Sequence, residues 1–405
     1  MNRLCNTDLT EAKLRQLLSE SPQLHQIFHS LDGIRAEILG DQGFTSKILR
    51  VQLNWLEKSK GDVSQYPKSI VVKVLGTEQL EQFAFDESMR EKMAEMTKCH
   101  RVAHDIECSV YKLDRLPDYI PIPRCYGFQR SNDQGFGVLL LEDMSDRGAV
   151  LLRQSFYGCF NNRQIENLLA ILTDLHTWSL NTDVDWKATI SNLANDHPLI
   201  ALTHALQAHL PHSQRAYPQV FEGLDEKKLE KFLCNEHFFK IFKEDPILVH
   251  KLPQVLVHGD VQSLNILFNK LPTGETGGEI VALLDWQAAH RGCGLEDIAN
   301  MFVMCLSTET RKNTGDQIIQ RYVQLFNQKV RNEANRLDIE QAKKAFEKML
   351  NYKALAFGCA LAGFDQVVSG MTELSYEEKE TVRADVINRT KSYFGDAIEF
   401  LNKWD

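Results

Sequence analysis

The sequence predicts an α+β protein in which a small β-rich lobe is followed by a large, mainly helical lobe. Up to residue 145 the chain alternates between strand-like runs and one long helical segment, whereas the sequence after Arg147 has mostly helical periodicity. The exception in this second part is one apolar hairpin between Val255 and Trp286. We therefore expect an N-terminal helical segment (1–30), an N-lobe (31–145) and a C-lobe (146–405) that contains the hairpin 255–287.

Composition and charge are those of an ordinary globular protein. Apolar residues make up 43% and charged residues 25% of the 405 residues, which indicates neither disorder nor a fibrous repeat. The net charge of −9 argues against binding to nucleic acid or to an anionic membrane surface. No apolar stretch approaches the ~20 residues of a membrane span, and the N-terminus lacks an apolar signal core. Together with nine scattered cysteines, typical of reduced thiols, this predicts a cytoplasmic protein of undetermined oligomeric state.

The elements of the predicted N-lobe follow one another closely. Leucines at helical spacing, with Thr10 as N-cap, predict a first helix that ends near Glu20. Two strand-like runs, 34–39 and 47–53, are joined by a glycine-bearing link, which is typical of a β-hairpin. The remaining strand runs and the long charged helical pattern lie at 70–75, 78–114, 124–129 and 136–141.

The apolar hairpin of the C-lobe is predicted to gather three oxygen-bearing side chains. Its two runs, 266–268 and 280–284, are separated by a turn-rich link and can pair as antiparallel strands. Asn265 precedes the first run and Asp285 follows the second, so both return to the same end of the hairpin. Asp260 lies on the loop that enters the first strand. We therefore expect these three residues at one rim.

Two carboxylates and an amide oxygen at one rim indicate phosphoryl transfer. Mg²⁺ is a hard cation that takes a few protein oxygens and otherwise coordinates phosphates. A nearby free aspartate can orient an attacking hydroxyl and accept its proton. In this arrangement one aspartate serves the nucleophile, while an asparagine and a second aspartate hold the metal ions.

The N-lobe offers a cation for the phosphates and a carboxylate to hold it. Lys73 lies in the middle of an apolar run, where an unpaired ammonium would be costly to bury. The helical segment supplies Glu107 as its partner, and Glu91 and Glu95 remain competing carboxylates on the same segment.

Two further segments of the N-lobe are candidates for nucleotide binding. Gly40 and Gly43 lie on the first hairpin, and backbone amides there could cover phosphates, although the loop is not a Gly-x-Gly-x-x-Gly. Glu142 and Met144 follow a buried-looking strand, at the point where the edge of an adenine would meet backbone groups.

Together these residues resemble the protein-kinase-like superfamily, in its choline kinase and aminoglycoside phosphotransferase branch. More narrowly, the chain resembles the CHK kinase-like (ecdysteroid-kinase-like) proteins over nearly its whole length. The specific marks are His258-Gly-Asp260, Asn265-Ile-Leu, Asp285-Trp-Gln and Gly294-Leu-Glu-Asp297-Ile-Ala-Asn300.

The resemblance implies a bilobal protein-kinase-like fold that uses ATP and Mg²⁺. It implies Asp260 as the catalytic base, Asn265 and Asp285 as the metal ligands, and Lys73 paired with Glu107. Asp297 in that family supports the structure of the catalytic loop.

Two features favour a small-molecule acceptor over a protein. Protein kinases place an arginine before the catalytic aspartate, where this chain has Gly259. Asp285 is followed by Trp286, and the next apparent helix begins near Leu295, which leaves no room for a peptide-docking platform. We therefore expect a small hydroxylated acceptor, choline-like, sterol-like or xenobiotic, bound between the hairpin rim and the helical insert of residues 150–250.

One departure from the family pattern keeps a second hypothesis open. Val261 and Gln262 stand where many CHK-like proteins have a Leu-Trp pair, at positions that border the acceptor pocket. This departure and the atypical glycine loop are compatible with a catalytically silent pseudokinase, a nucleotide- or ligand-binding sensor or scaffold.

Overall fold

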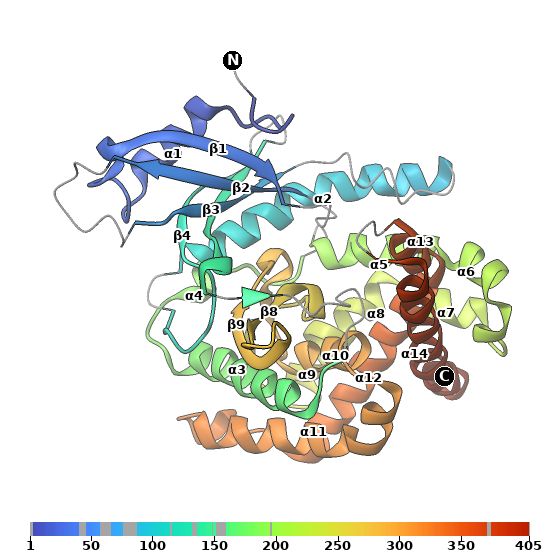
Figure 1. Cartoon of the computed structure of the whole chain (residues 1–405). Helices are drawn as coiled ribbons and strands as arrows, with labels where there is room; N and C mark the ends of the chain where they lie inside the picture. Colours follow the sequence, from blue (N-terminus) through green and yellow to red (C-terminus); the bar gives the residue numbers. More distant parts are fainter. Residues whose placement is uncertain are drawn as a thin grey trace.

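The computed structural model has a small β-sheet region, whose first three strands are drawn in blue in Figure 1, and a larger helical region. This arrangement confirms the predicted α+β class. The structure describes residues 3–39, 46–56, 66–75, 87–113, 116–131, 136–147, 149–150, 159–194, 197–370 and 374–404, with only the backbone described at 87–98, 146–147 and 149–150. Gly40 and Gly43 lie outside the described residues, as do the side chains of Glu91 and Glu95.

The N-terminal region is built on an antiparallel sheet of five strands. The strand order is β1-β2-β3-β5-β4, so the strand that carries Lys73 is central. The predicted first helix begins at its predicted cap, where the Thr10 side chain accepts a hydrogen bond from the backbone N–H of Lys13. The elements are α1 (Glu11–Glu20), β1 (Leu31–Ile38), β2 (Ser46–Trp55), β3 (Ser69–Leu75), α2 (Glu87–Tyr111), β4 (Cys125–Gln129) and β5 (Val138–Glu142).

The pleat of β3 decides which way Lys73 points. Val72 and Val74 belong to a small core that they share with Leu14 and Leu17 of α1. Because successive side chains of a strand lie on opposite faces of the sheet, Lys73 lies on the other face, away from that core. The strand therefore presents its lysine toward α2 and the helical region.

The long helix α2 connects the two regions. Its residues Ile106 and Val110 are part of the large core of the helical region, and the helix packs against α5 and a 3-10 turn at Trp286–Ala288. Figure 1 shows α2 running from below the sheet across the top of the helices. Its position is therefore fixed mainly by the helical region.

The second region is mostly helical, as predicted, and surrounds short strands. Its helices are α3 (Asn162–Asn181), α4 (Trp186–Thr189), α5 (Pro198–Ala208), α6 (Leu210–Ala216), α7 (Glu226–Phe232), α8 (Asn235–Phe239), α9 (Asp245–Leu248), α10 (Leu295–Met304), α11 (Thr308–Lys329), α12 (Ile339–Cys359), α13 (Leu361–Gly370) and α14 (Tyr376–Lys403). Its strands are β6 (Ala149–Val150), β7 (Val255–Val257), β8 (Ile266–Lys270), β9 (Thr276–Leu283) and β10 (His290–Gly292).

The predicted hairpin is present as β8 and β9, which place Ile266 opposite Leu283 and Phe268 opposite Ile280. The expectation of a single hairpin from residue 255 onward is wrong in detail. β7 does not join the hairpin but pairs with β10, and β6 adds a third strand beside β8. Strands as short as β6 and β10 have too few residues to show a period in the sequence.

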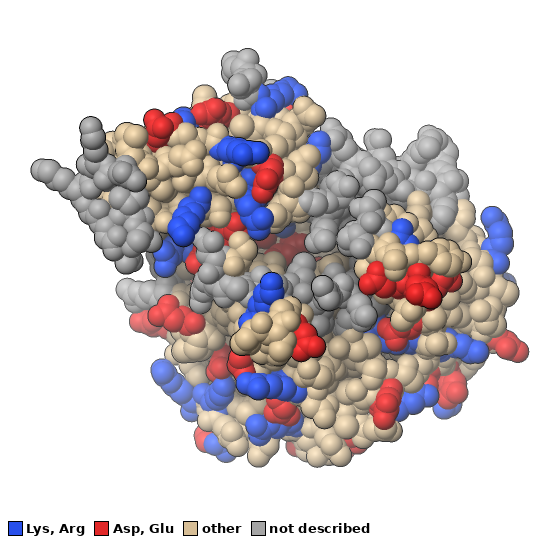
Figure 2. All heavy atoms as spheres, in the orientation of Figure 1, with Lys and Arg blue, Asp and Glu red and all other residues tan. Residues whose placement is uncertain are grey.

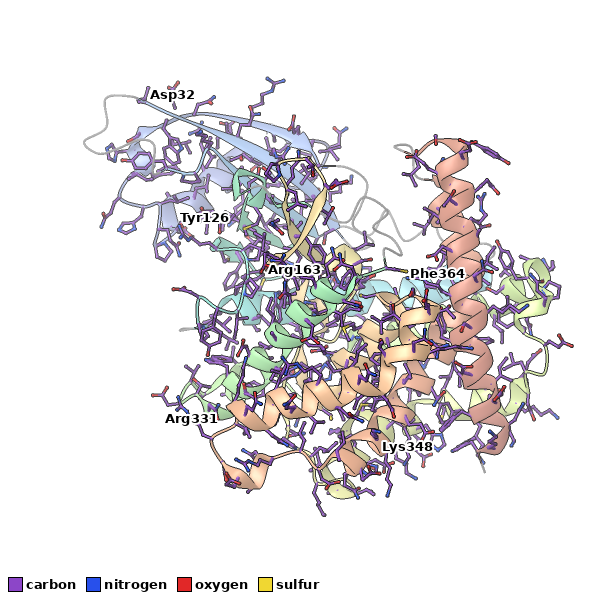
Figure 3. The ribbon with its side chains drawn as sticks, turned by 60° about the horizontal axis from the view of Figure 1, so that its bottom comes forward. Asp32, Tyr126, Arg163, Arg331, Lys348 and Phe364 are labelled. Carbon is purple, nitrogen blue, oxygen red and sulfur yellow. The ribbon has the colours of Figure 1, made fainter. Side chains whose placement is uncertain are left out.

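Charged side chains of both signs are interspersed on the face of the molecule shown in Figure 2. The turned view in Figure 3 separates the two regions clearly. Asp32 and Tyr126 lie on the side of the sheet, whereas Arg163, Arg331 and Lys348 lie in the helical region.

Helix α12 packs closely on α14, which gives a test of this arrangement. A Cβ added at Gly358 would lie 2.0 Å from Cδ2 of Phe394. We expect Gly358→Ala to lower the free energy of unfolding by about 1–3 kcal/mol, because it overpacks this crossing. Gly395→Ala is the matched control, since a Cβ there meets nothing within 4 Å and alanine favours the helix. Thermal unfolding should give a lower midpoint for the first variant only, and equal midpoints would contradict this packing.

Candidate active site

The loop that carries Asp260 requires a glycine at position 259. Gly259 has a φ of +84°, and a Cβ there would lie 2.3 Å from the carbonyl oxygen of Ala288. No side chain fits at this position, which explains why the arginine of protein kinases has no counterpart here. Both backbone groups of Gly259 are held by α10. Its N–H donates to Asp297 Oδ1 at 2.8 Å, and its carbonyl accepts from Asn300 Nδ2 at 2.8 Å.

Asp297 is the buried anchor of this loop, in agreement with the structural role that the family resemblance implies. Its other oxygen accepts from the backbone N–H of His258 at 2.9 Å and lies 3.1 Å from Nε2 of His176. The second nitrogen of His176 lies 2.8 Å from the hydroxyl of Tyr322. Asp297 and His176 are fully buried, so the loop rests on a closed network of hydrogen bonds.

The carboxylate of Asp260 is held by two side-chain amides. Gln262 Nε2 lies 3.0 and 2.9 Å from its two oxygens, and Asn265 Nδ2 lies 2.9 Å from Oδ2. A carboxylate has about four acceptor sites, so about one site remains for a ligand. Burial, and the negative charge of nearby Asp285, raise the pKa of Asp260 above its ordinary value. The departure at Gln262 thus orients Asp260 directly, while Val261 is buried in the core.

Asp285 is placed by an unusual backbone conformation at the end of β9. Its φ of 61° and ψ of 68° are left-handed, a conformation that aspartate tolerates better than most residues do. Both backbone groups of the preceding residue, Leu284, make hydrogen bonds. Leu284 N–H donates to the carbonyl of Asn265 at 2.8 Å, and His258 Nε2 donates to the carbonyl of Leu284 at 2.9 Å. His258 therefore has a structural role, because it links the loops of Asp260 and Asp285.

Lys73 lies between two carboxylates from different parts of the chain. Its Nζ is 2.7 Å from Oε2 of Glu107 and 2.7 Å from Oδ1 of Asp285. Although burial opposes its charge, Asp285 and Glu107 together raise the pKa of Lys73. Glu107 also accepts a hydrogen bond from the backbone N–H of Trp286, the residue after Asp285. The sheet, α2 and the hairpin therefore meet at this ammonium.

Two further predicted nucleotide-binding residues, Glu142 and Met144, lie at the end of β5 and in the turn that follows it. Glu142 ends β5, and its N–H donates to the carbonyl of Arg124 at 2.8 Å. Met144 is buried at the start of a 3-10 turn. Between them, Asp143 accepts from Arg50 Nε at 2.8 Å and from the hydroxyl of Ser69 at 2.7 Å. Asp143 thus holds the connector to β2 and β3, a role that no sequence pattern predicts.

The predicted metal ligands suit Mg²⁺ in their chemistry. Asn265 uses Nδ2 to donate to Asp260, which leaves its Oδ1 as an acceptor. The side chain of Asp285 keeps 27% of its surface exposed, so its second carboxylate oxygen can serve a ligand. An amide oxygen and a carboxylate are the hard donors that Mg²⁺ takes alongside phosphate oxygens. The donor set therefore fits the ion.

A family model and a curated relative match this chain. The model of the DUF1679 family, whose description is "Uncharacterized oxidoreductase dhs-27", matches residues 32–403. The chain belongs to this family. It is also 24% identical over 220 residues to the "Uncharacterized kinase-like protein D1044.1" of Caenorhabditis elegans, a match that covers 51% of each protein. The chain thus matches about half the length of this relative. Membership of the family and the kinase-like relative confirm the predicted resemblance to CHK kinase-like proteins, and neither name assigns a reaction to this chain.

Several solved structures of kinases have a similar course of the chain. A choline kinase of Cryptosporidium parvum is 14% identical with a TM-score of 0.47, and the match covers 98% of this chain and 99% of that one. An ethanolamine kinase of Plasmodium vivax is 13% identical with a TM-score of 0.42, covering 95% and 87%. In the described part of this chain, no helix has both the length and the apolar character that crossing a bilayer requires.

A buried charged cluster lies close to the Asp260 loop, and sequence patterns do not predict it. It consists of Glu296, His290 and Lys353. Glu296 lies 3.0 Å from Lys353 Nζ and 3.1 Å from His290 Nε2. Although burial opposes its charge, Lys353 and His290 lower the pKa of Glu296 to about 2. Both nitrogens of His290 face acceptors, since Nδ1 is 2.9 Å from the carbonyl of Ala288. Burial opposes the charge of His290, but Glu296 raises the pKa of His290 and so favours its charged form.

This cluster predicts a pH-dependent contribution to stability. A pKa raised in the folded state means that the stabilisation by His290 is full below its unfolded value of 6.5 and is lost as the pH rises through the folded pKa. We therefore expect His290→Gln to lower the unfolding midpoint more at about pH 6 than at about pH 9. The exposed His25→Gln variant is the control for loss of an imidazole. A larger loss for His290→Gln at the higher pH would contradict the assignment.

Proposed function

We propose that this protein is an ATP- and Mg²⁺-dependent phosphotransferase that phosphorylates a hydroxyl group of a small molecule. The observation that supports this proposal is the meeting of Lys73, Asp260, Asn265 and Asp285 at one junction of the sheet and the hairpin. These residues supply a cation for phosphates, a base for a hydroxyl and oxygen ligands for a metal ion. A catalytically silent site that only binds a nucleotide would not need all four of these residues.

In the proposed reaction Asp260 acts on the acceptor. Its remaining acceptor site would take the hydrogen of the acceptor hydroxyl and orient the oxygen toward the γ-phosphorus of ATP. As the new O–P bond forms, the bond from the γ-phosphorus to the bridging oxygen breaks, and that oxygen leaves with its electron pair on ADP. The hydroxyl proton passes to Asp260. Its raised pKa makes Asp260 a better proton acceptor than an ordinary aspartate.

Lys73 and the metal ligands would hold the nucleotide. An ammonium has three donors, so Lys73 can keep Glu107 and Asp285 and still reach a phosphate oxygen. Asn265 and Asp285 would hold Mg²⁺, which when bound neutralises charge on the β- and γ-phosphates. Glu142, Met144, Gly40 and Gly43 remain the proposed contacts for the adenine and the phosphates.

Removing the base tests the central assignment. We expect Asp260→Ala to lower phosphate transfer to an alcohol by about 10²- to 10⁴-fold, because the hydroxyl loses its proton acceptor. Transfer of labelled phosphate from ATP is the measurement, and Asp316→Ala on α11 is the matched control, since that aspartate pairs only with Lys343 on α12 among its described contacts. A wild-type rate in the Asp260 variant would refute the role. Binding of ATP without transfer to any acceptor would favour the pseudokinase hypothesis.

Removing the cation tests nucleotide binding separately. We expect Lys73→Met to weaken binding of Mg-ATP about tenfold or more, since hydrogen bonds to charged groups contribute ~1.5–3 kcal/mol. The measurement is the rise in unfolding midpoint on adding Mg-ATP, relative to the same variant without nucleotide. Lys68→Met, at an exposed position just before β3, is the control. An unchanged rise in the Lys73 variant would exclude this residue from the nucleotide site.

A further inference from the structure

A small cavity opens beside Asp260 on the side of the helical region. It is bounded by Gly259 and Asp260, by Asn300 of α10, and by apolar side chains of α5, α8 and α12 such as Leu199, Phe238 and Phe357. The free space is about 10 Å³, room for about one water molecule. If Asp260 serves a hydroxyl, the hydroxyl-bearing end of the acceptor enters here, so these walls decide which alcohols are accepted.

Asn300 brings an unused hydrogen-bond acceptor to this cavity. The residue is 2% exposed, and its Nδ2 donates to the carbonyl of Gly259 at 2.8 Å. Its Oδ1 is buried and has no hydrogen-bond partner in the described part of the chain. A buried acceptor of this kind is normally satisfied, and leaving it unpaired is unfavourable. A second donor on the acceptor molecule, such as another hydroxyl, would satisfy it.

Lys353 brings a positive charge to the same cavity. Its side chain is 8% exposed, its Nζ lies 3.0 Å from Oε1 of Glu296, and the ammonium is 5.0 Å from the ring centroid of Phe242. A carboxylate together with an aromatic face is the environment that binds a ligand ammonium. In this protein the position is filled by the chain's own ammonium. At this position a cationic group of the acceptor would therefore meet a like charge instead of a partner.

The carboxylate of Asp260 disfavours an acceptor that carries a negative charge. Its carboxylate lines the cavity, and Asp285 lies close enough to add to the negative potential. An anionic group next to the reacting hydroxyl would be repelled by both aspartates. The walls thus disfavour an anionic group beside the hydroxyl and a cationic group at the position that Lys353 fills.

We propose that the acceptor is an uncharged alcohol with a second hydrogen-bond donor near the reacting hydroxyl. Asn300 Oδ1 accepts from that donor, and Lys353, held by Glu296, excludes alcohols that carry an ammonium group. This inference rests on the proposed phosphotransferase function and adds to it the selection of the acceptor.

A fractionated metabolite extract tests the acceptor class. Ion-exchange resins divide the extract into cationic, anionic and uncharged fractions, and each is incubated with the full chain, Mg²⁺ and ATP radiolabelled at the γ-phosphate. We expect transfer that depends on the acceptor in the uncharged fraction. Equal or greater transfer in a charged fraction overturns the inference and leaves the phosphotransferase function intact. Transfer in none of the fractions overturns the proposed function, and the inference with it.

A matched pair of alcohols tests the role of Lys353. Choline is compared with its uncharged isostere, in which a tert-butyl group replaces the trimethylammonium group, and wild type should favour the isostere by about tenfold or more. Lys353→Met leaves the Glu296 carboxylate without its ammonium and should shift the preference toward choline by about tenfold or more. Lys353→Met combined with Glu296→Gln removes both charges and should produce no such shift.

Each variant is first checked by thermal unfolding, because Lys353→Met leaves the buried Glu296 with His290 as its ionic partner and so lowers stability. Should Lys353→Met not fold, the preference of wild type between choline and the isostere still decides the matter. A preference of wild type for choline, or a folded Lys353→Met variant with an unchanged preference, contradicts the assignment of Lys353.

Discussion

The structure of the site depends on the ammonium of Lys73. It lies 2.7 Å from carboxylates of two other parts of the chain, Glu107 of α2 and Asp285 at the end of β9. Without it, two buried or half-buried carboxylates would face each other, which is electrostatically unfavourable. Water cannot solvate the Lys73 ammonium in place of these carboxylates, because the side chain is only 11% exposed. The sheet region and the helical region are therefore joined by charge at the same point where the functional residues meet.

Helix α10 imposes a second constraint, on the loop that carries Asp260. Asp297 and Asn300 are one helical turn apart on the same face of the helix, and each holds a backbone group of Gly259. The loop is rigid because the hydrogen bonds fix the peptides on both sides of Gly259, while the carbonyl of Ala288 excludes any side chain there. His258 connects this loop to Asp285, because it donates a hydrogen bond to the carbonyl of Leu284, the residue before Asp285. The two aspartates are thus positioned by one connected set of buried hydrogen bonds.

Sequence reasoning was successful where the determinants are local. The β8–β9 hairpin places Asn265 and Asp285 together whatever the rest of the chain does, and the pattern of β3 shows that its lysine needs a partner. The choice among Glu91, Glu95 and Glu107 could not be made from helical periodicity, because it depends on where α2 packs against the turn after Asp285. The pairing of Glu296 with Lys353 joins residues 57 positions apart on two helices. Such a contact is decided by tertiary packing, and a single sequence carries no period or spacing that would reveal it.

The charges at the junction also bear on how a nucleotide could enter it. Glu107, Asp285 and Asp260 bring three carboxylates, and Lys73 is the ammonium that the described ion pairs place among them. A triphosphate adds several negative charges to a site that is already negative, so binding of the free nucleotide is opposed at short range. A divalent cation held by Asn265 and Asp285 would remove part of this repulsion on both sides at once. The same excess of negative charge gives the lysine its importance, since its ammonium lies 2.7 Å from both Glu107 and Asp285 and offsets their charge in a buried place.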